Sequence, residues 1–105
     1  MEYSIDVVQV KREVADQYKA SVVYTFTISN GFAKVHADVV LTEAGAAIIE
    51  QKGKDPKTAA KIVLERLLKK GRDPFETQIL LIVPYGHAEY FARYGNYETL
   101  PTLAD

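Results

Sequence analysis

The chain has 105 residues, of which 48% are hydrophobic and 26% charged, and it contains no cysteine. This length and composition are typical of one globular domain with a single core, and they exclude a disordered or fibrous chain. The absence of cysteine excludes disulfides, thiol nucleophiles and thiolate metal sites.

No segment of the sequence predicts a membrane span or an export signal. The longest apolar run, Ile79 to Val83, is far shorter than the roughly 20 residues of a spanning helix. The first residues, Met-Glu-Tyr-Ser-Ile-Asp, lack the basic start and apolar stretch of a signal peptide. The expectation is therefore a cytoplasmic protein with no membrane contact.

The first predicted strand runs from Tyr3 to Arg12. Its apolar positions are 3, 5 and 7, and then 8 and 10. Because side chains alternate between the two faces of a strand, this change of phase predicts a bulge near Val7 and Val8.

The clearest pattern, from Tyr18 to Leu41, predicts a β-hairpin. Apolar and polar residues alternate on both sides of Asn30-Gly31. This pair is preferred in two-residue type I′ turns, because both central residues need positive φ. Such a turn places Ser29 opposite Phe32. It also makes every inward pair apolar, and these pairs are Ile28–Ala33, Phe26–Val35, Tyr24–Ala37, Val22–Val39 and Ala20–Leu41.

Two predicted helices follow the hairpin. Thr42 can cap a short helix that ends at Gly53. Asp55-Pro56 supplies a cap and a first-turn proline for a second helix, which ends at Gly71. The second helix carries an apolar stripe that must pack on the sheet, and it consists of Ala60, Val63, Leu64, Leu67 and Leu68.

A short strand and a short helix complete the chain. Gln78 to Val83 is mainly apolar, which is typical of a strand that is buried on both faces or closely flanked by helices. His87 to Tyr94 fits two helical turns that end at Gly95.

This order of elements, β-β-β-α-α-β and a short helix, predicts an α+β two-layer sandwich. An antiparallel sheet would form one layer, and the helices would form the other. One domain would span residues 1–100, and residues 101–105 would form a frayed tail.

The motifs of the common enzyme classes are missing. The sequence has no glycine-rich phosphate loop, no dinucleotide fingerprint, no Gly-x-Ser-x-Gly elbow and no His-Glu-x-x-His pair. Neither histidine has a second histidine at ligand spacing. The sequence therefore favours a binding protein over an enzyme, and it predicts no cofactor and no metal.

The outer face of the hairpin is a candidate interface. Its polar stripe occupies positions 34, 36 and 38, but the same face ends in Val23 and Val40. Nothing in a two-layer fold would cover these valines, and exposed apolar area of this kind usually marks a contact. Ile62, on the charged side of the second helix, is a further candidate interface residue.

The segment from Pro84 to Tyr97 holds four of the seven tyrosines. Tyrosine buries its ring and keeps its hydroxyl wet, which suits an interface, a ligand pocket or closure of the core. The candidate binding residues are Tyr85, His87, Tyr90, Arg93 and Tyr94. In a small-ligand site or enzyme, His87 would supply an acid, Tyr85 an orienting group and Arg93 an anion clamp.

The second helix offers a nucleic-acid alternative. From Lys52 to Arg72, eight basic residues against two acidic residues give a net charge of +6, although the whole chain has a net charge of −1. The residues that could meet phosphates are Lys54, Lys57, Lys61, Arg66, Lys69 and Lys70. The same face also suits ordinary solvated pairs of Glu65 with Lys61 and Lys69.

The favoured hypothesis is a small stand-alone module that binds a protein partner or a ligand. It would be a homodimer that uses the outer sheet face together with the Tyr-rich C-terminal segment. Nucleic-acid binding by the basic helix, and a ligand site or enzyme at Tyr85, His87 and Arg93, are the alternatives.

Overall fold

A computed structural model of the chain describes residues 2–13 and 20–95. These residues form seven elements, which are β1 (Ser4–Glu13), β2 (Ser21–Ser29), β3 (Lys34–Thr42), α1 (Glu43–Gln51), α2 (Pro56–Lys69), β4 (Ile79–Val83) and α3 (Tyr85–Tyr94). Tyr18 at the start of the predicted hairpin, Tyr97 and the predicted tail of residues 101–105 lie outside the described residues.

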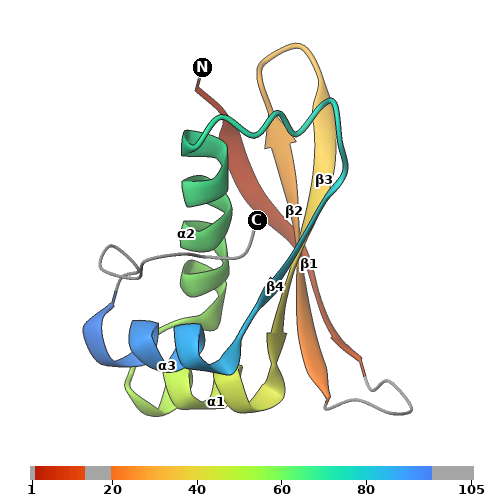
Figure 1. The fold of residues 1–105 in the computed structure, drawn as a ribbon. Helices are drawn as coiled ribbons and strands as arrows, with labels where there is room; N and C mark the ends of the chain where they lie inside the picture. The colour runs from red at the N-terminus through yellow and green to blue at the C-terminus, as the bar shows by residue number, and fades with distance from the viewer. Residues whose placement is uncertain (1, 14–19, 96–105) are drawn as a thin grey trace.

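The strands form one layer and the helices form the other (Figure 1). The strand order is β1-β2-β3-β4. Strands β1, β2 and β3 are antiparallel, whereas β4 runs parallel to β3. The predicted α+β two-layer sandwich is therefore confirmed, but the sheet is mixed and not wholly antiparallel. The direction of β4 follows from the crossover through α1 and α2, which returns the chain to the starting end of β3.

The predicted bulge in β1 is confirmed. Val7 pairs with Phe26 and Gln9 pairs with Thr25, so Val8 is an extra residue without a partner on β2. The change of phase in the apolar pattern is therefore caused by a β-bulge, as predicted.

The β2-β3 hairpin is present, but its predicted register is wrong by two residues. Ile28 pairs with Val35 and not with Ala33. Because side chains alternate with a period of two, a slip of two residues leaves each side chain on its predicted face. The inward side chains of the hairpin are Val22, Tyr24, Phe26, Ile28, Val35, Ala37, Val39 and Leu41.

The register differs because the turn is longer than predicted. Gly31 has a positive φ of 94°, but Asn30 does not, so a type I′ turn cannot form. Instead, Asn30 Oδ1 accepts hydrogen bonds from the backbone N–H groups of Phe32 and Ala33, each at 2.9 Å. The side chain of asparagine thus stabilises a four-residue loop, as it does in other Asx turns.

The helix starts agree with the predicted caps. Thr42 Oγ1 accepts a hydrogen bond from the N–H group of Gly45 at 3.0 Å. Asp55 Oδ1 accepts one from the N–H group of Lys57 at 2.9 Å. In the part of the chain that the structure describes, no helix is both long enough and apolar enough to cross a membrane.

The core lies between the two layers, where the predicted stripe of α2 packs against the sheet. Ala60, Val63, Leu64 and Leu67 are buried, and Leu68 is half-buried. Ile62, which was predicted to lie on the charged side of this helix, is not an exposed side chain. It is half-buried and packs against the same core.

The prediction that β4 is buried on both faces is wrong, whereas its alternative, close flanking by helices, holds for the core face alone. Ile79, Leu81 and Val83 face the core, and Leu80 and Ile82 are 62% and 66% exposed. Among the described residues, no helix covers the outer face of this edge strand.

Candidate interaction surface on the outer face of the sheet

Four apolar side chains lie together on the outer face of the sheet. Val23 pairs with Val40, and Val40 pairs with Ile82, so these three residues form one row across β2, β3 and β4. Leu80 lies in the next row, beside Asp38. Neighbouring strands are about 4.8 Å apart, so these side chains are in reach of one another. We call Val23, Val40, Leu80 and Ile82 the outer patch.

No helix or strand of the described residues, 2–13 and 20–95, covers the outer patch. Val23 and Val40 are half-buried by their neighbours, and Leu80 and Ile82 are mostly exposed. All three helices of the described residues lie on the other face of the sheet (Figure 1). Sequence reasoning found the two valines but missed Leu80 and Ile82, because an entirely apolar run gives no alternation from which to infer an exposed face.

Polar and charged groups surround the outer patch. Thr25 Oγ1 donates a hydrogen bond to Asp38 Oδ1 at 2.7 Å. On the outer face of β1, Lys11 Nζ lies 3.5 Å from a carboxylate oxygen of Glu13. The face therefore carries both signs of charge around an apolar centre, which is the usual composition of a protein interface.

The described part of the Tyr-rich segment, residues 84–95, lies in the helical layer. Ala88, Phe91 and Ala92 of α3 are buried, and α3 packs against α1. Helix α3 and the outer patch therefore lie on different sides of the sheet (Figure 1).

A surface hollow on α3 includes Arg93 but neither Tyr85 nor His87. This hollow of about 230 Å³ is lined by Gly86, Glu89, Tyr90, Arg93 and Tyr94. In this hollow the ring centroids of Tyr90 and Tyr94 are 4.6 Å apart. Tyr85 and His87 do not line it, so the proposed acid, orienting group and anion clamp do not converge there.

His87 instead lies half-buried between helices. Its Nδ1 atom is buried and has no hydrogen-bond partner among the described residues. Burial lowers the pKa of His87, and the nearby positive charge of Arg66 lowers this pKa further. The neutral imidazole is therefore the form that the folded protein favours.

Lowering the pH is expected to destabilise the fold through His87. The pKa of His87 in the folded state lies below its ordinary value of 6.5, so the unfolded chain binds the proton first and stability falls as the pH drops below about 6.5. Thermal unfolding at pH 7.5 and pH 5.5 measures this effect. His87→Gln should reduce the loss of Tm, and the control His36→Gln, at an exposed histidine, should not. If His87→Gln lost as much Tm as the unaltered protein, protonation of His87 would not be the cause of the destabilisation.

The basic side chains predicted for nucleic acid divide into two groups. Lys54 is engaged within the chain, because its Nζ donates a hydrogen bond to the backbone oxygen of Ala92 at 2.8 Å, near the end of α3. Arg66 is half-buried. The exposed members are Lys57, Lys61, Lys69 and Lys70. The predicted pairs of Glu65 with Lys61 and Lys69 are not formed among the described residues.

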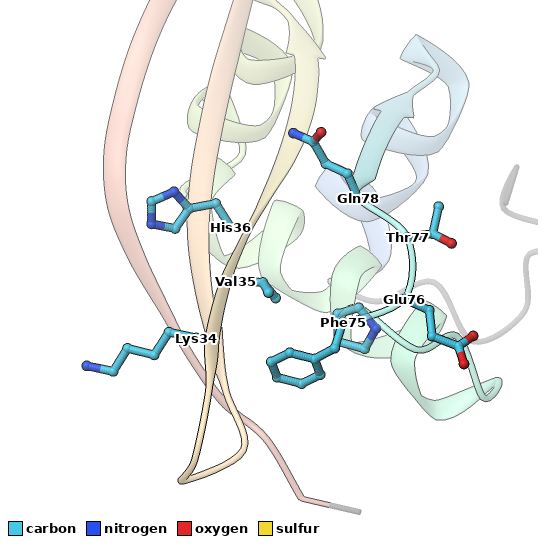
Figure 2. A pocket seen from close by; sticks show the side chains of 8 residues that line it. Lys34, Val35, His36, Phe75, Glu76, Thr77 and Gln78 are labelled. Atoms are coloured by element: carbon cyan, nitrogen blue, oxygen red, sulfur yellow. The ribbon is translucent and has the colours of Figure 1, made fainter.

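A second hollow, of about 330 Å³, lies at the end of the sheet beyond β4 (Figure 2). It forms because β4 begins opposite Ala37, so residues 34–36 of β3 pair with β2 on one side and have no partner from β4 on the other. Val35 points toward Phe75, whereas Lys34 and His36 point away from it (Figure 2). The titratable groups thus do not converge, and the described residues contain no group of three or more side chains suited to hold a metal ion.

An α+β two-layer sandwich defines an architecture and not an activity. No protein-family model matches this chain, and no curated protein or solved structure matches it. Function must therefore be inferred from the chain's own surface.

Proposed function

We propose that this protein acts by self-association, with the outer patch at the centre of the contact between two copies. The observation that carries the proposal is the exposure of Leu80 and Ile82, at 62% and 66%, beside Val40 on one face of the sheet. Full burial of one such side chain contributes about 1.5–3 kcal/mol. The patches of two copies together can therefore offset much of the entropy that association costs.

The composition of the outer face supports a second copy as the partner. The charged groups on this face are of both signs, with Lys11 and Lys34 against Asp6, Glu13 and Asp38. Two identical faces can therefore meet without a strong excess of one charge, whereas a nucleic acid or an anionic membrane would favour a positive surface.

The size of the outer face also supports this partner. Four strands of about eight residues on average give a face on the order of 20 Å by 27 Å. Side chains make this face uneven, so its accessible surface area is larger than the flat estimate. It approaches the roughly 800 Å² that each partner buries in a standard interface. A twofold dimer is the commonest way to bury one such face against itself.

Val40→Lys is expected to halve the mass of the assembly. The ammonium group would enter the apolar centre of the contact and lose its hydration without a partner. Multi-angle light scattering at micromolar concentration should give the unaltered protein a mass of at least twice 11.7 kDa, and the variant half of that mass. A lysine at this half-buried position can extend into solvent in the single copy, so the fold should persist, and circular dichroism checks this.

Thr58→Lys is the matched control. Thr58 is exposed on α2, in the helical layer and away from the outer sheet face, so a lysine there should leave the mass unchanged. The proposal fails if the unaltered protein is a monomer at high concentration, or if both lysine variants have the same effect.

A further inference from the structure

The two edges of the sheet are built differently. The β1 edge carries a bulge at Val8 and four charged residues, which are Asp6, Lys11, Arg12 and Glu13. Bulges and charges are the devices by which natural sheets prevent their edges from pairing with other chains. The β1 edge is therefore protected.

The β4 edge has none of these devices. Its five residues, Ile79 to Val83, are all apolar, and its pairing with β3 contains no bulge. In the described part of the chain β4 has a strand on one side only. Part of its backbone N–H and C=O groups therefore point away from β3, where an extended backbone can pair with them.

We infer that β4 pairs with β4 of a second copy of this chain, in antiparallel orientation around a twofold axis at Leu81. In this register Leu80 lies opposite Ile82 of the partner subunit, and Ile79 lies opposite Val83 of the partner subunit. The core-facing side chains thus meet core-facing side chains, and the outer ones meet outer ones, as a continuous sheet requires. The result is an eight-stranded sheet.

The sequence of β4 is suited to pairing with itself in this register. All five residues of each strand then have an apolar residue opposite. An axis at Leu80 would place Gln78 opposite Ile82, and an axis at Ile82 would place Pro84 opposite Leu80. Either choice brings a polar side chain or a residue without an N–H group into the ladder. The axis at Leu81 is therefore the favoured one.

Edge pairing also explains where the outer patch lies. Leu80 and Ile82 are on the outermost strand, whereas the outer face of β1 is polar and charged. Joining two copies at β4 brings both patches to the middle of one larger face, with the polar β1 strands at its rim. An apolar centre with a polar rim is the arrangement found in stable interfaces. Together with the face contact proposed above, this gives four copies with dihedral symmetry.

The edge contact goes beyond the proposed face contact and has its own test. The chain contains no cysteine, so single introduced thiols can report the pairing without interference. Leu80→Cys and Ile82→Cys are prepared separately, each also carrying Val40→Lys to remove the face contact. The two variants are then mixed and oxidised, and the products are identified by mass spectrometry.

The mixed sample should yield a disulfide-linked pair that contains one chain of each variant. Opposed residues in an antiparallel ladder have Cα atoms about 4.5–5.5 Å apart, within the range that a disulfide bridges. Either variant alone should stay unlinked, because identical residues would lie about 8 Å apart across the axis by strand geometry.

Gln9→Cys and Lys11→Cys supply the matched control. They lie two residues apart on the outer face of the protected β1 edge, and their mixture should stay unlinked. The inference is overturned if the folded β4 variants do not form a disulfide when mixed. Occupation of the β4 edge by the chain's own residues 96–105 would give this result. It is also overturned if either β4 variant alone links as well as the mixture. An unchanged mass in Val40→Lys would remove the face contact and leave the disulfide result unaffected, whereas a monomeric unaltered protein would contradict both contacts.

Discussion

Replacing Phe26 with alanine is expected to lower the free energy of unfolding by about 3–5 kcal/mol. Phe26 lies on the central strand β2, is 1% exposed and points toward the helical layer. The substitution removes the transfer free energy of the ring and leaves a cavity that the close-packed neighbours cannot fill. A domain of this size has a total stability of about 5–15 kcal/mol, so the loss is a large fraction of it. Equilibrium unfolding in urea measures the change.

Phe32→Ala is the matched control, because it removes the same side chain from a different environment. Phe32 sits in the β2-β3 loop and is 99% exposed, so its loss should change the stability by no more than about 0.5 kcal/mol. Equal losses for the two variants would show that the core does not lie between the sheet and the helices.

Gly45→Leu is expected to destabilise the protein by about 1–3 kcal/mol through overpacking. A Cβ atom at Gly45 would lie 3.1 Å from Ala88 Cβ and 3.2 Å from Thr42 Oγ1. The longer side chain would force α3 away from α1 and disturb the cap of α1. This effect should exceed the gain of less than about 1 kcal/mol that leucine brings to a helix interior relative to glycine.

Two measurements distinguish overpacking at Gly45 from a general weakening of α1. Urea unfolding of Ala47→Leu, at an exposed position of the same helix, should show a change of no more than about 0.5 kcal/mol. Hydrogen exchange of Gly45→Leu should be faster in α3 than in the unaltered protein. Unchanged exchange in α3 would mean that Gly45 does not control the distance between these helices.

Local rules predicted much of this fold from the sequence. The bulge at Val8 follows from one change of apolar phase, and the starts of α1 and α2 follow from Thr42 and Asp55, whose side chains accept hydrogen bonds from their own helices. These features depend on residues that are close in the chain. Sequence patterns report such short-range interactions directly.

The features that the sequence could not predict depend on competition or on distant contacts. Asparagine at position 30 is suited to two different turns. It can adopt the positive φ of a type I′ turn, or its side chain can accept hydrogen bonds from the N–H groups that follow, as it does here. The residue type alone does not decide between these two turns. The exposure of Leu80 and Ile82 depends on the position of their strand at the edge of the sheet. This position is set by the crossover of α1 and α2 and not by β4 itself.

The same distinction applies to the candidate site. The alternation in β2 and β3 was sufficient to predict that Val23 and Val40 face outward. Lys54 donates a hydrogen bond to the backbone oxygen of Ala92, 38 residues away. No pattern in the sequence around Lys54 indicates this contact. The position of the Tyr-rich segment also depends on tertiary packing. Its described residues, 84–95, lie in the helical layer, and no local pattern indicates this layer.

In the proposed assembly, another copy of the chain covers the outer face of the sheet. The most direct test is the broadening of methyl NMR signals by a soluble paramagnetic agent. The methyl groups of Leu80 and Ile82, 62% and 66% exposed in one copy, are compared with those of Val10, which is 51% exposed and pairs with inward-facing Tyr24. We expect Leu80 and Ile82 to broaden much less than Val10. Broadening of Leu80 and Ile82 equal to or greater than that of Val10 would contradict this assembly.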